Sequence, residues 1–339
     1  MRRRRGPSRS VPAMIPTPPE TVLSDWRYRA AMLSVALAAC GYLVFALIGD
    51  GRAVASAIAS VGLPVLFIAL LLSLVNYALR FIRWQAYLST LGHAIPWRPS
   101  LQIYFAGFAL ITTPAKAGEA VRGVILKRRG VPYPDTLAAV FSERVADLAG
   151  ILPLTLLGLA IYPEARPLIY LGGGLAILFV LLLTRRHWLL ALQAALPTSA
   201  GIQKWGGHFF QILLQAERFH RPRILSLAVI LSLLGWAAEA GAFFVILQAM
   251  GTDVPWMHAA FIFAIAILAG ALTFTPGGLG STEAVMTALL VWAGVGLPEA
   301  IAATLLIRIT TLWFAVAIGA VAMASVTRSR TTRETPDSP

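Results

Sequence analysis

Long apolar segments with almost no charge recur along the whole chain, and they constrain the fold more than any other feature. Six of them have the length of a membrane-spanning helix: 30–48, 63–79, 136–161, 168–184, 224–250 and 299–326. A helix crosses a bilayer with about 20 apolar residues. Because the segments are continuous instead of alternating apolar and polar residues, they exclude a transmembrane β-barrel. The sequence predicts an all-α polytopic membrane protein.

Positive charge is concentrated between the apolar segments. The chain has 28 Lys and Arg residues against 15 Asp and Glu, and the basic groups that include Arg80, Arg83 and Arg98 are interpreted as cytosolic loops. No basic domain is left over for a nucleic acid, so none is expected as a partner. We expect both termini in the cytosol, with residues 1–28 as a basic disordered arm, 29–326 as one membrane domain and 327–339 as a tail.

Two regions do not fit a simple count of spans. Residues 100–113 are too short to cross comfortably and have basic flanks on both sides, and residues 259–294 are interrupted in their middle. We interpret each region as a re-entrant helical hairpin, which gives about six transmembrane helices plus two hairpins. Eight transmembrane helices with kinks are the alternative. The residues expected at the two breaks are Pro114, Gly118, Pro276, Gly277, Gly278 and Gly280.

The chain also contains an internal repeat. Leu91-Gly92 through Pro96-Trp97 matches Met250-Gly251 through Pro255-Trp256, and Arg144 and Arg308 follow matching prolines at the same spacing. Repeat A covers 61–161 and repeat B covers 224–324, with an interfacial linker at 187–222 that carries a helix along the membrane surface. The charge pattern sends the two repeats in opposite directions, and inverted repeats with broken helices are typical of secondary transporters.

Ionisable residues within apolar segments are costly, at roughly 2.5 to 3.5 kcal/mol each, so they must pair, be hydrated or meet a charged ligand. Eight residues share this property: Glu119, Arg122, Glu143, Arg144, Asp147, Glu239, Glu283 and Arg308. Glu143 and Asp147 lie on one helix face and Arg144 projects about 100 degrees away from Glu143, so Arg144 can point elsewhere. The repeat axis would bring Arg144 and Arg308 to one cavity with Lys116, a receptor for phosphate. Structural ion pairs to Glu283, Glu119 or Glu239 are the alternative.

No cofactor and no metal site is predicted. The five histidines stand singly at segment edges, and Cys40 is the one cysteine of the chain. Neither residue type therefore occurs at the spacing of metal ligands.

Several motifs occur together in a recognisable order. They are Pro114-Ala115-Lys116-Ala117-Gly118-Glu119 with Arg122, Ser142-Glu143-Arg144 with Asp147, and Pro276-Gly277-Gly278-Leu279-Gly280 with Glu283 and Arg308. This set resembles the lysylphosphatidylglycerol synthase transmembrane-region family, the flippase-like part of bacterial multiple peptide resistance factors. The resemblance implies movement of a lipid between leaflets. Those factors carry a cytosolic aminoacyl-transferase domain after the membrane part, whereas this chain ends at Pro339, so it is not expected to aminoacylate lipids itself.

Combining the charges with the resemblance predicts a lipid transporter in the cytoplasmic membrane of a bacterium, moving a polar or phosphate-containing lipid between leaflets. The residues expected to bind the head group are Lys116, Glu119, Arg122, Arg144, Glu283 and Arg308, and the carboxylates expected to couple transport to protons are Glu143, Asp147 and Glu239. The expected partners are the membrane lipid itself and a separate lipid-synthesis enzyme or glycosyltransferase, and no oligomeric state is predicted.

Two other functions stay open. A membrane-embedded lipid-modifying transferase or hydrolase would need a nucleophile beside a base; Ser142 and Ser281 lie close to carboxylates in sequence, but no deep histidine accompanies them. A non-transporting scaffold for a lipid-synthesis enzyme would use the amphipathic region around Trp205 as its contact.

Overall fold

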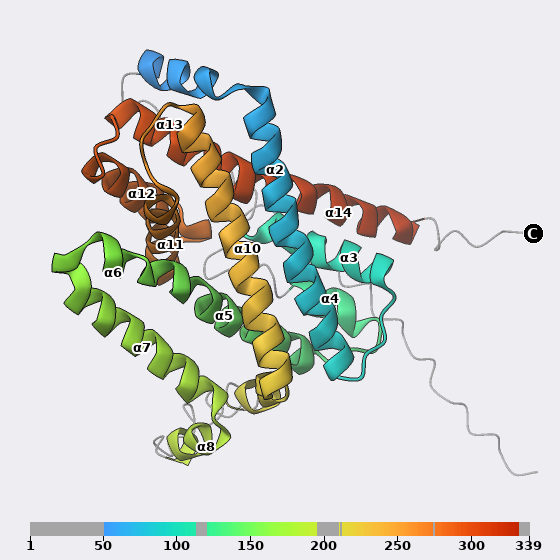
Figure 1. Cartoon of the computed structure of the whole chain (residues 1–339). Helices are drawn as coiled ribbons and strands as arrows, with labels where there is room; N and C mark the ends of the chain where they lie inside the picture. The colour runs from blue at the N-terminus through green and yellow to red at the C-terminus, as the bar shows by residue number, and fades with distance from the viewer. Residues whose placement is uncertain (1–50, 113–120, 195–209, 211, 274, 332–339) are drawn as a thin grey trace, which may run out of the picture.

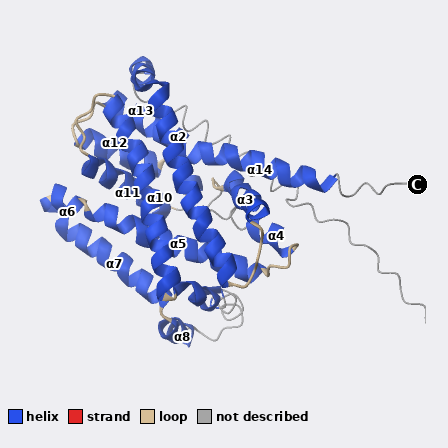
Figure 2. Ribbon diagram, turned by 45° about the vertical axis from the view of Figure 1, so that its right-hand side comes forward, coloured by secondary structure: helices blue, strands red, loops and turns tan. Residues whose placement is uncertain are grey.

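A computed structural model describes residues 51–112, 121–194, 210, 212–273 and 275–331, and within these ranges the chain is helical, with no strand. Figures 1 and 2 show the helices gathered into one bundle. The longer helices are α2 (Gly51–Thr90), α5 (Tyr133–Leu156), α7 (Arg166–Thr184), α10 (Pro222–Ala249), α11 (Trp256–Leu272), α12 (Ser281–Trp292), α13 (Leu297–Arg308) and α14 (Phe314–Thr331). The shorter ones are α3 (Trp97–Ala106), α4 (Val121–Lys127), α6 (Gly158–Ile161) and α8 (Arg186–Ala194).

Four of the described helical stretches are long and apolar enough to cross a bilayer: Gly51–Thr90, Tyr133–Ile161, Pro222–Ala249 and Leu297–Ser325. Each contains one of the apolar segments seen in the sequence, and α7 contains the shorter apolar stretch Ile169–Leu182. The prediction of an all-α polytopic membrane protein is confirmed. The segment 30–48 lies outside the described residues.

Helices α2 and α10 make a long mutual contact. They pack along each other, and Figure 1 shows them running in opposite directions. Near the middle of this contact Gly235 lies against Asn76: a Cβ added to the glycine would be 3.1 Å from the amide nitrogen of Asn76. The small residue therefore lets the two backbones approach closely, as in other membrane helix pairs.

Two apolar cores pack against this pair of helices. One core joins α10 to α11, α12 and α13 and contains Phe243, Phe263 and Ile307. The other joins the second half of α2 to α3, α4, α5 and α14 and contains Trp84 and Phe108. Within the described residues, the predicted repeats A and B each contain a long helix, then shorter helices and then a further long helix.

Matching turns occur at the positions that the repeat aligns. Gly92 and Gly251 both have positive φ, at 82° and 73°, and each follows the end of a long helix. The following residues make equivalent backbone hydrogen bonds: His93 N–H donates to Leu88 O at 3.0 Å and Thr252 N–H donates to Leu247 O at 3.2 Å. The repeat and its inverted orientation stay predictions.

The second hairpin is interrupted where the sequence has its glycines. Helix α11 ends at Leu272 and α12 begins at Ser281, with a short turn η5 (Pro276–Gly278) between them. Gly277, Gly278 and Gly280 all have positive φ, a backbone conformation that residues with a Cβ adopt at a steric cost. The first hairpin comprises α3, the 3₁₀ turn η1 (Gly107–Leu110) and α4. Its expected break residues Pro114 and Gly118 lie outside the described residues.

The close crossing of α5 and α10 gives a test of this packing. A Cβ added to Gly150 would lie 2.5 Å from Ser232 Cβ and 2.8 Å from Leu233 N, so Gly150→Ala should overpack the contact and cost about 1 to 3 kcal/mol. We expect a lower Tm for this variant. Gly174→Ala in α7 is the control, because an added Cβ there meets nothing within 4 Å. Equal Tm values for both variants would contradict the crossing.

Candidate functional site

One face of the second half of α2 is polar and aromatic although it is buried. The residues on this face are Asn76, Tyr77, Arg80, Arg83, Trp84 and Tyr87, all buried in the bundle. Their spacing follows the turns of a helix, so they line one stripe along it. The interpretation of Arg80 and Arg83 as cytosolic loop residues is wrong, because α2 continues to Thr90 and both side chains point into the bundle.

Asp147 on α5 is the carboxylate that these arginines share. Its Oδ1 lies 2.7 Å from Arg83 Nη1, and its Oδ2 lies 3.3 Å from Arg80 Nη2 and 3.3 Å from Arg144 Nη2. Ser232 on α10 accepts a hydrogen bond from Arg83. Asp147 therefore ties α5 to α2 through the two guanidinium groups of Arg80 and Arg83, and it also pairs with Arg144 on its own helix.

Arg144 does not point away from the two acidic residues beside it. Its Nη2 reaches Asp147 and also lies 3.8 Å from Glu143 Oε2. Arg144 reaches Asp147 because residues three apart are neighbours on the surface of one helix. About 30% of this side chain stays exposed.

Arg122 is held on the other side of Glu143. Its Nη1 lies 3.0 Å from Glu143 Oε2, and its guanidinium carbon lies 4.9 Å from the ring centroid of Trp84 and 4.5 Å from that of Tyr104. Two aromatic faces therefore contact one buried cation, an arrangement that stabilises it without adding negative charge. Gly107 makes room for it, since an added Cβ would lie 2.8 Å from Arg122 Nε.

These residues form one group, which we call the arginine cluster: Arg80, Arg83, Arg122, Glu143, Arg144 and Asp147. It contains four arginines and two carboxylates. Apart from Arg144, its side chains are at most 9% exposed. Arg144 is the member of the cluster that reaches the surface.

Arg308 forms a separate ion pair with Glu283. Arg308 Nε lies 2.6 Å from Glu283 Oε1, and its Nη2 donates to the backbone oxygen of Gly277 at 2.6 Å. Glu283 Oε2 also accepts from the backbone N–H of Gly280 at 2.6 Å, so the carboxylate caps the start of α12. The pair ties α13 to the break of the second hairpin. It is the kind of structural ion pair that the sequence left open as an alternative.

The break of the second hairpin lies close to the residues that follow α3 and η1 in the first hairpin. A Cβ added to Gly277 would lie 3.5 Å from the Cα of Thr112. A π-helical turn, Ile309–Trp313, follows Arg308 directly, and the hydroxyl of Tyr77 donates to the backbone oxygen of Thr311 in it. The Arg308–Glu283 pair and the arginine cluster thus belong to one continuous set of packed elements. This set includes a π-helical turn, a feature that frequently occurs at functional positions.

The remaining predicted site residues are distributed as follows. Glu239 is buried on α10 and interacts electrostatically with Tyr77. Lys116 and Glu119 lie outside the described residues. The ion pairs place Arg144 in the arginine cluster and Arg308 with Glu283, so the meeting of these two arginines in one cavity stays a prediction.

Sequence reasoning missed Arg80 and Arg83 although a signal was present. Hydropathy places the end of the apolar segment at residue 79, but polar residues that begin with Asn76 continue past it at intervals of three to four, at Arg80, Arg83 and Tyr87. This spacing is that of one helix face, and it indicates a buried polar stripe on a helix that continues past the apolar segment.

The structure also brings a histidine to Ser142. His220, in the turn η4 (Glu217–His220), has its Nε2 3.5 Å from Ser142 Oγ. Sequence reasoning found no histidine near this serine, because 78 residues separate the two. The contact is longer than the roughly 2.6 to 3.2 Å of a working base and nucleophile, and Ser142 is 1% exposed.

Burial of His220 gives a pH-dependent prediction. Loss of solvent lowers the pKa of His220 to about 4, although the nearby Glu217 acts in the opposite direction. The unfolded chain takes up a proton near the ordinary pKa of about 6.5. The folded state is therefore destabilised as pH falls from about 6.5 toward about 4. We expect Tm to drop more between about pH 7.5 and about pH 5 for the natural chain than for His220→Gln. The same drop in both would contradict this role of burial.

The helices and buried charges define a multi-pass α-helical membrane protein with a polar interior. Residues 31–319 match the Lysylphosphatidylglycerol synthase TM region, and the chain belongs to this family.

Similar proteins come from archaea. A UPF0104 membrane protein of Methanothermobacter thermautotrophicus is 26% identical over 285 residues, covering 76% of this chain and 82% of that protein. A UPF0104 membrane protein of Pyrococcus horikoshii is 23% identical over 285 residues, covering 76% and 85%. Glycosyltransferase AglD of Haloferax volcanii is 26% identical over 273 residues, covering 66% of this chain and 42% of that protein.

Proposed function

We propose that this chain moves a phosphate-bearing lipid between the leaflets of a membrane and that the arginine cluster receives the lipid head group on the way. The observation that carries the proposal is the gathering of four arginines at Glu143 and Asp147 inside the membrane domain. Within the described residues, Nε and Nη2 of Arg83 are buried without a hydrogen-bond acceptor.

Buried guanidinium N–H groups without an acceptor are costly, and the oxygens of an anion that binds beside them would supply one. Guanidinium groups form paired, charge-assisted hydrogen bonds with phosphate oxygens. The Arg144 side chain supplies the point of contact, because about 30% of it is exposed while the rest of the cluster is closed off. The acyl or isoprenoid chains would stay in the bilayer.

Movement between leaflets needs a site that opens to each side in turn. The antiparallel packing of α2 and α10, the matching turns at Gly92 and Gly251 and the common order of elements all support two inverted halves. In transporters built this way, the substrate site lies at the interface between the halves, near broken helices. The contact between Gly277 and Thr112 brings parts of the two hairpins together beside this interface.

The carboxylates take different roles in the proposal. Glu143 and Asp147 hold the arginines in position, so we assign them to the architecture of the site. Glu239 is the buried carboxylate left for coupling to protons, a role in which intramembrane acidic residues commonly act.

The cellular setting is also part of the proposal. We place the basic segments, and with them both termini, on the cytosolic side. The membrane in this proposal is the cytoplasmic membrane of a bacterium. A partner enzyme that makes or uses the lipid, such as a glycosyltransferase, fits a chain whose relatives include one with that name.

A leaflet-specific assay tests the function. The purified protein is reconstituted into vesicles with a fluorescent phosphatidylglycerol, and in parallel with a fluorescent glycolipid that has no phosphate, and the dye in the outer leaflet is quenched chemically. We expect faster crossing of the phosphate lipid than in empty vesicles and no acceleration of the glycolipid. Crossing of the phosphate lipid at the rate of empty vesicles would contradict the proposal.

The contact of Ser142 with His220 favours one second candidate, a lipid-modifying transferase or hydrolase. It predicts that purified protein releases product from a radiolabelled lipid and that Ser142→Ala abolishes this release. The transport proposal predicts no release, with crossing rates in Ser142→Ala close to those of the natural chain.

A further inference from the structure

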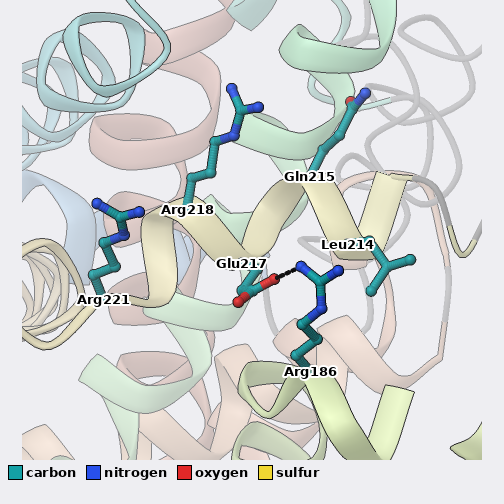
Figure 3. Close-up of a pocket in the computed structure, with 6 residues that line it drawn as sticks. All are labelled: Arg186, Leu214, Gln215, Glu217, Arg218 and Arg221. Atoms are coloured by element: carbon teal, nitrogen blue, oxygen red, sulfur yellow. Dashed lines mark hydrogen bonds and ion pairs between the residues drawn. The ribbon is translucent and has the colours of Figure 1, made fainter. Parts of the chain in front are cut away.

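A basic pocket lies outside the arginine cluster, at the turn that leads into α10. It has a volume of about 570 Å³ and is lined by Arg186, Leu214, Gln215, Glu217, Arg218 and Arg221. We call it the linker pocket, because its residues belong to the segment that connects the two halves. Figure 3 shows Arg186 reaching Glu217, with Arg218 and Arg221 on the neighbouring turn.

The charges of the linker pocket are unequal. Glu217 forms an ion pair with Arg186 at 2.9 Å, which fixes one guanidinium group and uses the carboxylate. Among the residues that the structure describes, Arg218 and Arg221 have no ion-pair partner, and both are exposed. Three arginines therefore face one carboxylate, and two of them are available to an anion.

The position of the pocket along the helices indicates its depth in the membrane. The apolar helix α7 ends at Thr184, two residues before Arg186, and α10 begins at Pro222, directly after Arg221. Arginines at the ends of apolar helices lie at the level of the lipid phosphates, where basic residues attract anionic lipids. Leu214 gives the lining an apolar part beside the charged groups.

We propose that the linker pocket binds the phosphate of an anionic phospholipid head group from the leaflet that surrounds these helix ends. Arg218 and Arg221 donate to the phosphate oxygens, and the pair of Arg186 with Glu217 holds the far side of the pocket in shape. The site is independent of the transport proposal, because it lies on the surface and does not include any residue of the arginine cluster.

The turn η4 connects the linker pocket to the interior of the bundle. The turn η4 carries Glu217 and Arg218 toward the pocket, while its Phe219 packs on Tyr87 with ring centroids 4.6 Å apart and its His220 contacts Ser142. A lipid bound at the pocket would therefore steady the turn that covers α5 beside Glu143 and Arg144.

Equilibrium binding of radiolabelled dihexanoylphosphatidylglycerol to the purified full chain in detergent tests the proposal. We expect Arg218→Gln and Arg221→Gln each to weaken binding roughly fivefold, and the double variant roughly 25-fold. Arg223→Gln is the matched control, because Arg223 is exposed in the first turn of α10, two residues after Arg221, and does not line the pocket. None of these variants changes the arginine cluster, so lipid bound there adds the same background to every binding measurement. Tm measurements identify any variant that is not folded, and Arg218→Lys with Arg221→Lys then tests the site with the charge retained.

Competition separates a lipid from a soluble anion as the source of the phosphate. We expect inorganic phosphate to displace the radiolabelled lipid only at much higher concentration than unlabelled dihexanoylphosphatidylglycerol does. Displacement by inorganic phosphate at the same concentration would overturn the assignment to a lipid. An equal loss of binding in Arg223→Gln would overturn the site itself, because it would show attraction by diffuse surface charge.

Discussion

Replacement of Asp147 by asparagine is expected to destabilise the membrane domain by about 3 to 5 kcal/mol, because it leaves buried guanidinium groups without their shared carboxylate. The distances of 2.7 and 3.3 Å to Arg83 and Arg80 make this carboxylate the one that neutralises the buried stripe of α2. The measurement is the Tm of the purified variant and its yield of folded protein from membranes. We expect a large fall in both.

Asp253→Asn is the control for this variant, since Asp253 is exposed in the turn that follows α10. Its Tm should equal that of the natural chain. A Tm for Asp147→Asn that matches the control would mean that the arginines are neutralised by other groups and that Asp147 is not the centre of the cluster.

Arg144→Gln is expected to slow the crossing of a phosphate lipid by about 10-fold to about 100-fold while the protein stays folded. The loss corresponds to one or two charge-assisted hydrogen bonds to phosphate, at about 1.5 to 3 kcal/mol in all. The fold should tolerate the change because the side chain is about 30% exposed and Asp147 keeps Arg80 and Arg83. The measurement is the crossing rate in reconstituted vesicles at equal protein content.

Arg129→Gln serves as the matched control in the same vesicles, because Arg129 is exposed in the turn after α4. With this variant, the lipid should cross the vesicle membrane at the same rate as with the natural chain. If Arg144→Gln also keeps the natural rate, the arginine cluster does not contact the lipid during transport and its role is structural.

The broad fold was predictable because the thickness of the bilayer sets the length of the apolar segments in the sequence. Long apolar segments, glycine-rich breaks and matched loop motifs are local signals, and α5, α10 and the break at Gly277 correspond to them. The course of α2 past residue 79 was harder to predict, because a hydropathy window ends at the first charge. A helix continues through Arg80 and Arg83 because Asp147, 67 and 64 residues further along the chain, neutralises them.

Side-chain partners could be predicted only in part. The pairing of Arg308 with Glu283 was open as an alternative, since both residues belong to the same motif region. The sharing of Asp147 by three arginines, the aromatic contacts of Arg122 and the approach of His220 to Ser142 depend on how distant helices pack. Helix periodicity fixes the face on which a residue lies, but it does not fix which other helix covers that face.

The most direct test of a head-group site inside the bundle is photo-crosslinking. A phosphate lipid with a photoreactive group on its head is added to the reconstituted protein, and the labelled peptides are identified by mass spectrometry. We expect adducts on the polar face of α2 between Asn76 and Tyr87 and on α5 around Arg144, with fewer in Arg144→Gln. Adducts confined to the exposed apolar surface of α7, at equal levels in both proteins, would contradict a lipid path through the arginine cluster.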